Sequence, residues 1–151
     1  EGVAGPHAIQ LHGPLEGTYE GSFDLTQELN RLKDIRAVIP DSIEVWRALD
    51  LTTATGVAAA QALATSENVD RLVLDSGGGT GRTFDWAQIP DEALSNALLA
   101  GGVGPENAAA AMATGVAGVD LNSQVEYGSG ARKVRKDPAK IRAALQAVRK
   151  P

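Results

Sequence analysis

Asp75 is the residue of this sequence best suited to acid–base chemistry. It closes the apolar run Arg71–Asp75, which has the composition of a buried strand, and a glycine-rich segment follows it. A carboxyl group held at the end of such a strand can transfer a proton to a bound substrate near neutral pH. We therefore predict that Asp75 is a general acid. The alternative is an ordinary helix cap or a hydrogen bond that anchors the following loop.

Two short segments have the features of a phosphate site. Gly101 and Gly102 end an apolar run and are soon followed by a helical pattern, and Asn122 and Ser123 follow the next apolar run. Glycine leaves backbone N–H groups accessible, and a helix N-terminus attracts anions. We predict that these four residues bind a phosphate group. A tight turn into a helix is the alternative for the two glycines.

Three further polar residues lie in or directly after apolar runs and are candidates for substrate contacts. They are His12, Arg47 and Asp120. The chain has two histidines, without the spacing of a metal site, and no cysteine. We therefore expect no metal site and no disulfide.

The segment 76–83 resembles a nucleotide-binding loop only superficially. A phosphate-binding loop of the G-x-x-x-x-G-K-[ST] type needs a glycine where Ser76 stands and a lysine where Arg82 stands. A loop that closes over the substrate fits better, and Arg82 would then contact an anionic group. A solvated surface loop is the alternative.

These candidates are distributed over a regular series of predicted elements. Apolar runs typical of buried strands alternate with helical patterns, which indicates a parallel sheet covered by helices. In such α/β folds the active site lies at the carboxyl ends of the strands, where the candidates stand. The expected strands are residues 8–11, 43–49, 71–75, 97–100 and 117–121, and the expected helices are residues 24–35, 53–64, 85–95, 105–112 and 138–148.

The length of the chain limits the architecture. We expect residues 1–151 to form a single domain, either an open doubly wound sheet or part of a (β/α)8 barrel. A complete barrel usually needs about 200 residues or more, whereas this chain holds five units. Because its first residue is Glu1 and not methionine, we expect a fragment of a longer protein.

The charge balance excludes some classes of partner. Fourteen Lys and Arg against nineteen Asp and Glu give a net charge of −5. Nucleic acids and anionic membranes need an extended basic surface, so we expect neither. No segment resembles a signal peptide or an apolar membrane span, and we expect a cytoplasmic protein whose ligand is a small phosphorylated molecule.

Six short blocks together resemble the phosphoribosylanthranilate isomerases, and they occur in that family's order. The blocks are Gln-Leu-His-Gly (10–13), Leu-Asp-Ser-Gly-Gly-Gly-Thr-Gly-Arg-Thr-Phe-Asp-Trp (74–86), Leu-Leu-Ala-Gly-Gly (98–102), Gly-Pro-Glu-Asn (104–107), Gly-Val-Asp-Leu-Asn-Ser-Gln-Val-Glu (118–126) and Lys-Asp-Pro-Ala-Lys-Ile (136–141). The variant Val-Trp-Arg-Ala-Leu (45–49) is most similar to enzymes in which the isomerase is fused to indole-glycerol-phosphate synthase.

The resemblance implies an Amadori rearrangement of N-(5-phosphoribosyl)anthranilate in tryptophan biosynthesis, without a cofactor. It implies a (β/α)8 barrel of which this chain holds strands four to eight. Asp75 would protonate the ring oxygen, and the phosphate would lie against residues 101–102 and 122–123. His12, Arg47 and Asp120 would line the substrate pocket, and Arg82 would help to close it.

The family's general base is a cysteine in a Lys-Ile-Cys-Gly motif on the first strand. This chain has no cysteine, so the resemblance implies that the base and the first three βα units come from an N-terminal segment. A fused or separate synthase domain is a further expected partner. Two alternatives are a related phosphosugar isomerase with a barrel fold and a non-catalytic barrel fragment.

Overall fold

The computed structural model describes residues 5–15, 23–76, 84–128 and 135–149. Its strands are β1 (Ala8–Leu11), β2 (Glu44–Asp50), β3 (Arg71–Asp75), β4 (Ala97–Leu99) and β5 (Gly118–Val119). Its α-helices are α1 (Leu25–Val38), α2 (Ala54–Leu63), α3 (Asp91–Leu94), α4 (Ala108–Ala113) and α5 (Pro138–Val148). Two short 3-10 helices, η1 (Trp86–Gln88) and η2 (Ser123–Val125), lie after β3 and β5.

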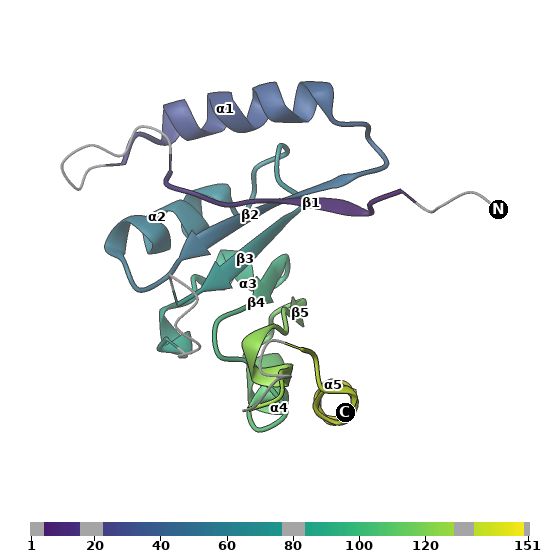
Figure 1. Ribbon diagram of the computed structural model, residues 1–151. Coiled ribbons are helices and arrows are strands. Elements are labelled where there is room, and N and C mark those ends of the chain that lie inside the picture. Colours follow the sequence, from purple (N-terminus) through teal and green to yellow (C-terminus); the bar gives the residue numbers. More distant parts are fainter. Residues whose placement is uncertain (1–4, 16–22, 77–83, 129–134, 150–151) are drawn as a thin grey trace.

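The strands form one sheet in the order in which they occur along the chain, β1-β2-β3-β4-β5, and every neighbouring pair is parallel. Figure 1 shows the sheet turning from β1 to β5, with α1 beside β1 and α4 and α5 near β5. The predicted α/β fold with a parallel sheet is therefore confirmed. All strand ends that carry candidate residues lie along one edge of this sheet.

The two faces of the sheet differ in exposure because side chains alternate along each strand. In β2, Val45, Arg47 and Leu49 are buried, whereas the intervening residues are only half-buried. The parallel register pairs Arg47 with Leu72 and Asp50 with Asp75, so the alternation continues across the sheet. The buried face packs on the helices. The half-buried face carries the polar residues at the strand ends.

Leucine, valine and alanine side chains fill the space between the buried face and the helices. The cluster contains Leu32, Leu49, Leu51, Ala59, Ala60, Leu63, Val69, Leu72, Leu74, Ile89, Ala93, Ala97, Leu99, Val103, Ala108, Ala111 and Val116. The small residues of α2 let this helix approach the sheet closely. A Cβ atom on Gly56 would lie 1.7 Å from the backbone oxygen of Asp50, so only glycine fits at this position.

Side-chain caps fix where three helices begin. The side chains of Asp24 and Thr53 accept hydrogen bonds from the backbone N–H groups of Thr26 and Gly56 at 2.9 Å, which starts α1 and α2. Asp137 accepts from the Ala139 N–H at 2.8 Å and Pro138 is the first residue of α5, as predicted.

Two predicted helices are corrected by the structure. Residues 85–95 form η1 and α3 instead of one helix, because Pro90 cannot continue a helix and becomes the N-cap of α3. Pro105 does not begin α4, which starts at Ala108. No helix in the described ranges is both long and apolar enough to cross a lipid bilayer.

Candidate functional site

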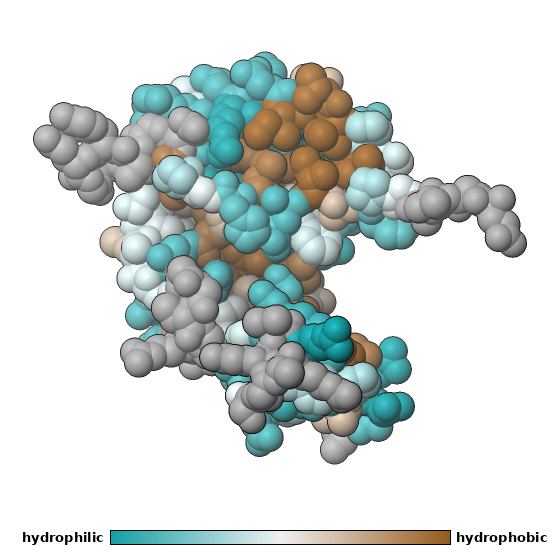
Figure 2. All heavy atoms as spheres, viewed as in Figure 1, coloured by the Kyte–Doolittle hydropathy of each residue, from teal (hydrophilic) through white to brown (hydrophobic). Residues whose placement is uncertain are grey.

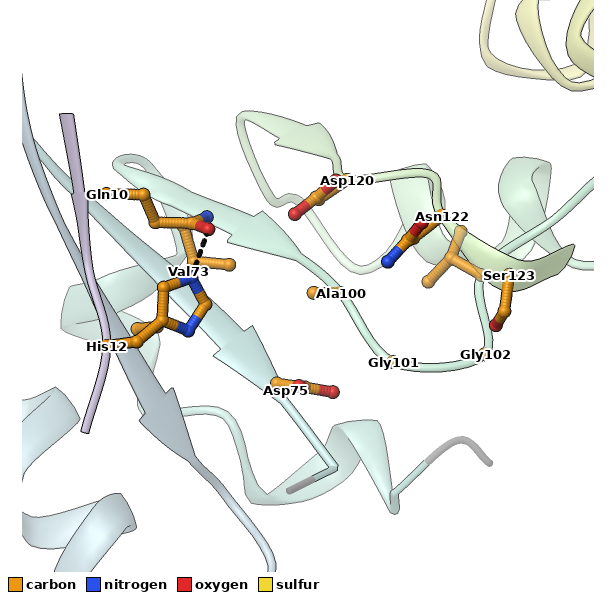
Figure 3. Close-up of a pocket in the computed structure, with 12 residues that line it drawn as sticks. Gln10, His12, Val73, Asp75, Ala100, Gly101, Gly102, Asp120, Asn122 and Ser123 are labelled. Atoms are coloured by element: carbon orange, nitrogen blue, oxygen red, sulfur yellow. Dashed lines mark hydrogen bonds between the residues drawn. The ribbon is translucent and has the colours of Figure 1, made fainter. Parts of the chain in front are cut away.

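A pocket of about 250 Å³ lies at the carboxyl ends of the strands. Every strand, or the residue that directly follows it, contributes to the wall (Figure 3). The lining residues are Gln10, His12, Ala48, Val73, Asp75, Ala100, Gly101, Gly102, Val103, Asp120, Asn122 and Ser123. Seven of the nine predicted site residues are among them. The pocket therefore gathers residues that are far apart in the sequence.

Asp75 ends β3, and its side chain points into the pocket toward the loop that follows β4 (Figure 3). Its Oδ1 atom accepts a hydrogen bond from the Ser76 backbone N–H at 2.6 Å. Its backbone oxygen accepts from the Leu51 N–H at 3.0 Å, which ties the end of β3 to the end of β2. The carboxyl group is thus held at a fixed place on the pocket wall.

Gly101 and Gly102 form the wall that faces Asp75. Their φ angles are +72° and +71°, a region of backbone conformation that side chains disfavour. A Cβ atom on Gly101 would lie 2.4 Å from Asp75 Oδ1 and 2.8 Å from the Ser76 nitrogen. The close approach of the carboxyl group to this backbone therefore requires glycine.

Asn107 fixes the loop after the glycine pair. Its side-chain oxygen accepts from the Gly104 N–H at 2.8 Å, and its side-chain nitrogen donates to the Gly102 oxygen at 3.1 Å. This bridge closes residues 102–107 into a turn. The backbone N–H groups of Asn107 and Ala108 both donate to the Gly104 oxygen, at 3.2 and 2.9 Å, so this turn leads into α4, which begins at Ala108.

Asn122 and Ser123 lie at the start of η2, next to the glycine pair on the pocket wall (Figure 3). The Lys136 ammonium group donates to both the backbone oxygen and the side-chain oxygen of Asn122. It also forms an ion pair with Glu126 at 2.7 Å. Because its oxygen is engaged by Lys136, the Asn122 side chain is oriented with its amide nitrogen toward the pocket (Figure 3).

His12 and Gln10 form the opposite side of the pocket, and the His12 ring is hydrogen-bonded to the Gln10 side chain (Figure 3). Asp120 directly follows β5, not within it as predicted, and its N–H donates to the Leu99 oxygen at 2.9 Å. Gln10 was missed as a site residue. Its position two residues before His12 places both side chains on the same face, and this spacing could have identified it.

The structure places Arg47 away from the pocket, which corrects its predicted location. Its side chain is fully buried on the helix-facing side of β2, and Nε donates to Glu28 Oε1 of α1 at 2.7 Å. The cause is its position in β2, which continues for three residues beyond Arg47 to Asp50. Alternation along the strand directs Arg47 and Asp50 to opposite faces.

Arg82, the other predicted substrate contact, lies outside the described residues. Within the described part of the chain, no group of three His, Cys, Asp or Glu side chains could hold a metal ion. The pocket thus presents two carboxyl groups, Asp75 beside the glycine backbone and Asp120 after β5, with amide, hydroxyl and imidazole groups around them. Such a set can transfer a proton to one part of a ligand while binding an anion at another.

Comparison with known proteins agrees with this arrangement. The family model described as N-(5'phosphoribosyl)anthranilate (PRA) isomerase matches residues 2–147. The tryptophan biosynthesis protein TrpCF of Corynebacterium glutamicum is 41% identical over 130 residues, which is 85% of this chain and 26% of that protein. The N-(5'-phosphoribosyl)anthranilate isomerase of Rhodopseudomonas palustris is 34% identical over 154 residues, covering 95% of this chain and 62% of that protein.

A solved structure gives the same result for the fold. The crystal structure of phosphoribosyl anthranilate isomerase from Thermus thermophilus matches with a TM-score of 0.62 and 25% sequence identity. The match covers 94% of this chain and 60% of the solved one. This chain therefore spans about a quarter of its TrpCF relative and about three-fifths of the solved isomerase.

Proposed function

The chain belongs to the N-(5'-phosphoribosyl)anthranilate isomerase family, and we propose that the protein containing it isomerises N-(5-phosphoribosyl)anthranilate in tryptophan biosynthesis. The product of this Amadori rearrangement is 1-(2-carboxyphenylamino)-1-deoxyribulose 5-phosphate. One observation carries the proposal: the Asp75 carboxyl group lines the same pocket as the glycine backbone of residues 101–102 and the polar residues Asn122 and Ser123. A phosphorylated sugar can lie in this pocket with its two ends in different environments.

In this proposal the phosphate lies against the wall formed by Gly101, Gly102, Asn122 and Ser123. The two left-handed glycines expose backbone to the pocket, and the nitrogen of the Asn122 side chain points into it (Figure 3). Hydrogen bonds from uncharged donors can hold a phosphate without a basic patch. His12 and Asp120, with Gln10, then contact polar groups of the sugar and the anthranilate.

Asp75 acts as the general acid in this proposal. Its proton passes to the furanose ring oxygen, the bond between that oxygen and C1 breaks, and the nitrogen lone pair stabilises C1 as an iminium ion. A base then removes the proton from C2 to give an enamine, which tautomerises to the ketone product. Because this chain has no cysteine, the family's cysteine base would come from residues outside it.

We further propose that residues 1–151 form strands four to eight of one (β/α)8 barrel domain. Among the described residues, β1 pairs only with β2, and β5 only with β4, so the sheet has two open edges. Figure 2 shows hydrophobic surface beside β1 and the end of α1, where Val38 is 79% exposed. Three further βα units would cover this surface and close the sheet, which agrees with the share of the solved isomerase that the chain covers.

The coverage also supports a partner domain. The chain spans 26% of the TrpCF protein of Corynebacterium glutamicum, which leaves room for the rest of a barrel and another domain. In this proposal the other domain is an indole-glycerol-phosphate synthase, fused or separate.

The Asp75→Asn variant of the full-length protein tests the function. Product formation from N-(5-phosphoribosyl)anthranilate should fall by about 10²–10⁴-fold, because an amide cannot supply the proton. Binding of a reduced, unreactive substrate analogue should persist within about threefold. The matched control is Asp50→Asn. Asp50 pairs with Asp75 in the sheet, but its carboxyl accepts from the Thr52 N–H at 2.9 Å and does not line the pocket.

Three outcomes are decisive. A wild-type protein without turnover would reject the proposed activity. Near-wild-type turnover of Asp75→Asn would remove Asp75 from the acid role. An equal loss in Asp50→Asn would mean that any change of charge at this edge of the sheet is harmful.

A further inference from the structure

Arg47 is the only fully buried basic side chain among the described residues, and it lies directly behind the pocket wall that carries His12. We propose that Arg47 is a positioning residue, which holds the loop after β1 so that His12 faces the substrate. The inference rests on the proposed function, because it assigns to Arg47 a role in that reaction without substrate contact.

The hydrogen bonds of the guanidinium group converge on the loop after β1. Nη1 donates to the oxygens of Leu11 and Gly13 at 3.2 and 3.3 Å. Nη2 donates to the oxygens of Gly13 and Pro14 at 3.3 and 3.1 Å. These three residues surround His12 in the sequence, and Gly13 has a φ angle of +100°. Arg47 therefore fixes the backbone on both sides of the residue that faces the pocket.

Two other bonds fix Arg47 itself. Nη1 also donates to the oxygen of Ala48, which lines the pocket, at 3.1 Å. Nε donates to Oε1 of Glu28, whose side chain is fully buried in α1. A buried charge needs such a partner, and the carboxylate neutralises the guanidinium. The loop, the strand and the helix are thus joined at one point.

The geometry requires arginine specifically. A guanidinium group has five N–H donors in a rigid plane, and Arg47 uses all three of its nitrogens. A lysine keeps the charge opposite Glu28 but has three donors on a single atom, so it cannot hold the Glu28 carboxylate and the three loop carbonyls together. Arg47→Lys therefore tests the arrangement of donors and not the charge.

Arg36 provides a matched control at the other end of the sheet. It extends from α1, with Nη1 donating to the Ile43 oxygen at 3.0 Å and Nη2 paired with Asp70. These partners precede β2 and β3, far from the pocket edge. Arg36→Lys should lower the thermal unfolding temperature without reducing kcat/KM by more than about twofold.

The test is made in the full-length protein. Arg47→Lys should lower kcat/KM at least about tenfold relative to Arg36→Lys, since misplacement by about 1 Å can cost two orders of magnitude. If Arg47 acts through His12, adding Arg47→Lys to His12→Asn should change kcat/KM by less than about twofold. A tenfold further loss in that background, or equal kcat/KM in the two lysine variants, would overturn the proposal.

A second measurement does not depend on turnover. The His12 imidazole NMR signals, assigned by their loss in His12→Asn, should shift or broaden in Arg47→Lys, whereas those of His7 should not. Unchanged His12 signals would overturn the inference. If the wild type lacks turnover, the proposed function fails and the NMR result alone decides the positioning role. If Arg47→Lys does not fold, Glu28→Gln should produce the His12 shift, and unchanged signals in that variant would likewise overturn it.

Discussion

On the helix-facing side of the sheet, Arg47 and Glu28 are both fully buried and bound to each other at 2.7 Å. On the pocket side, Asp75 and Asp120 are only half-buried, and both line a cavity. Each nitrogen of Arg47 has an acceptor within the protein. A group whose bonds are all made inside the protein can stabilise the fold but cannot bind a ligand. Side chains alternate between the two faces of a strand. The face on which a charged residue lies therefore determines whether it stabilises the fold or can bind a ligand.

The largest expected effect tests the buried side. Glu28→Ala leaves the Arg47 charge unpaired in the core and should lower the free energy of unfolding by about 3–5 kcal/mol. The control is Glu44→Ala on the opposite face, where the Glu44–Arg71 ion pair is 35–43% exposed and should be worth about 1 kcal/mol or less. Urea unfolding of both variants measures the difference. Equal losses of unfolding free energy in Glu28→Ala and Glu44→Ala would contradict the contrast between the two faces of the sheet.

The second prediction concerns the pocket side. Gly101→Ala would bring a methyl group to 2.4 Å from Asp75 Oδ1, so the carboxyl group must move and kcat/KM should fall about 10²-fold. Gly115→Ala is matched in backbone strain, with a φ angle of +95°, but its nearest neighbour is Leu94 at 3.9 Å. Both variants should lose about 1 kcal/mol of stability. Similar kcat/KM values in Gly101→Ala and Gly115→Ala would show that catalysis tolerates a displacement of the Asp75 carboxyl group.

A smaller effect is expected at the proposed phosphate wall. Lys136→Met removes both hydrogen bonds to Asn122 and should weaken binding of inorganic phosphate about fivefold, the equivalent of about 1 kcal/mol. Lys140→Met is the control, because its ammonium group donates to the Glu126 oxygen and not to Asn122. Calorimetric titration with phosphate measures the affinity of the two variants and of the wild type. Unchanged affinity in Lys136→Met would mean that Asn122 is oriented without the lysine.

The smallest effect is at the exposed cap of α1, the helix that carries Glu28. The hydrogen bond from the Gln27 side chain, and then that from the Thr26 backbone, lowers the pKa of Asp24 below its ordinary value of 3.8. The ionised form therefore stabilises the folded state above pH 3.8, and this contribution is lost as the pH falls through the lowered pKa. Asp24→Asn should be less stable than wild type at pH 7, and the difference should narrow as the pH falls below 3.8 and through the lowered pKa. A difference in stability that does not change with pH would contradict the assignment of ionised Asp24 as the stabilising cap of α1.

Local signals in the sequence predicted most of the fold. The strand Arg71–Asp75 has the predicted bounds, because a continuous apolar run ending in a charge and a glycine-rich segment marks a buried strand on both sides. Asp137 and Pro138 fixed the start of α5 for a similar reason, since capping depends on adjacent residues only. Pro105 misled because residues 104–107 form a turn that precedes the helix, and α4 begins only at Ala108.

Pocket residues could be predicted from the sequence where they lie at the ends of strands. They could not be predicted where the pocket depends on which face of a strand a side chain occupies. Asp75, Gly101 and Asn122 meet because parallel strands bring their carboxyl ends to one edge. Arg47 was placed wrongly because it lies within its strand, where alternation directs the side chain to the helix-facing side and not to the pocket. The bonds of Arg47 to Glu28 and to the loop after β1 join distant segments, which no local pattern reveals.

The residues that follow η2 pair with those that precede α5, and this pairing has a practical consequence. Glu126 and Lys136 form an antiparallel bridge, with the Tyr127 N–H bonded to the Arg135 oxygen and the Asp137 N–H to the Val125 oxygen. Both ends of the intervening segment are thus fastened to each other. A peptide tag or a fluorescent reporter inserted between residues 128 and 135 should therefore leave Asn122 and Lys136 in place, because the paired residues on either side of the insertion hold each other.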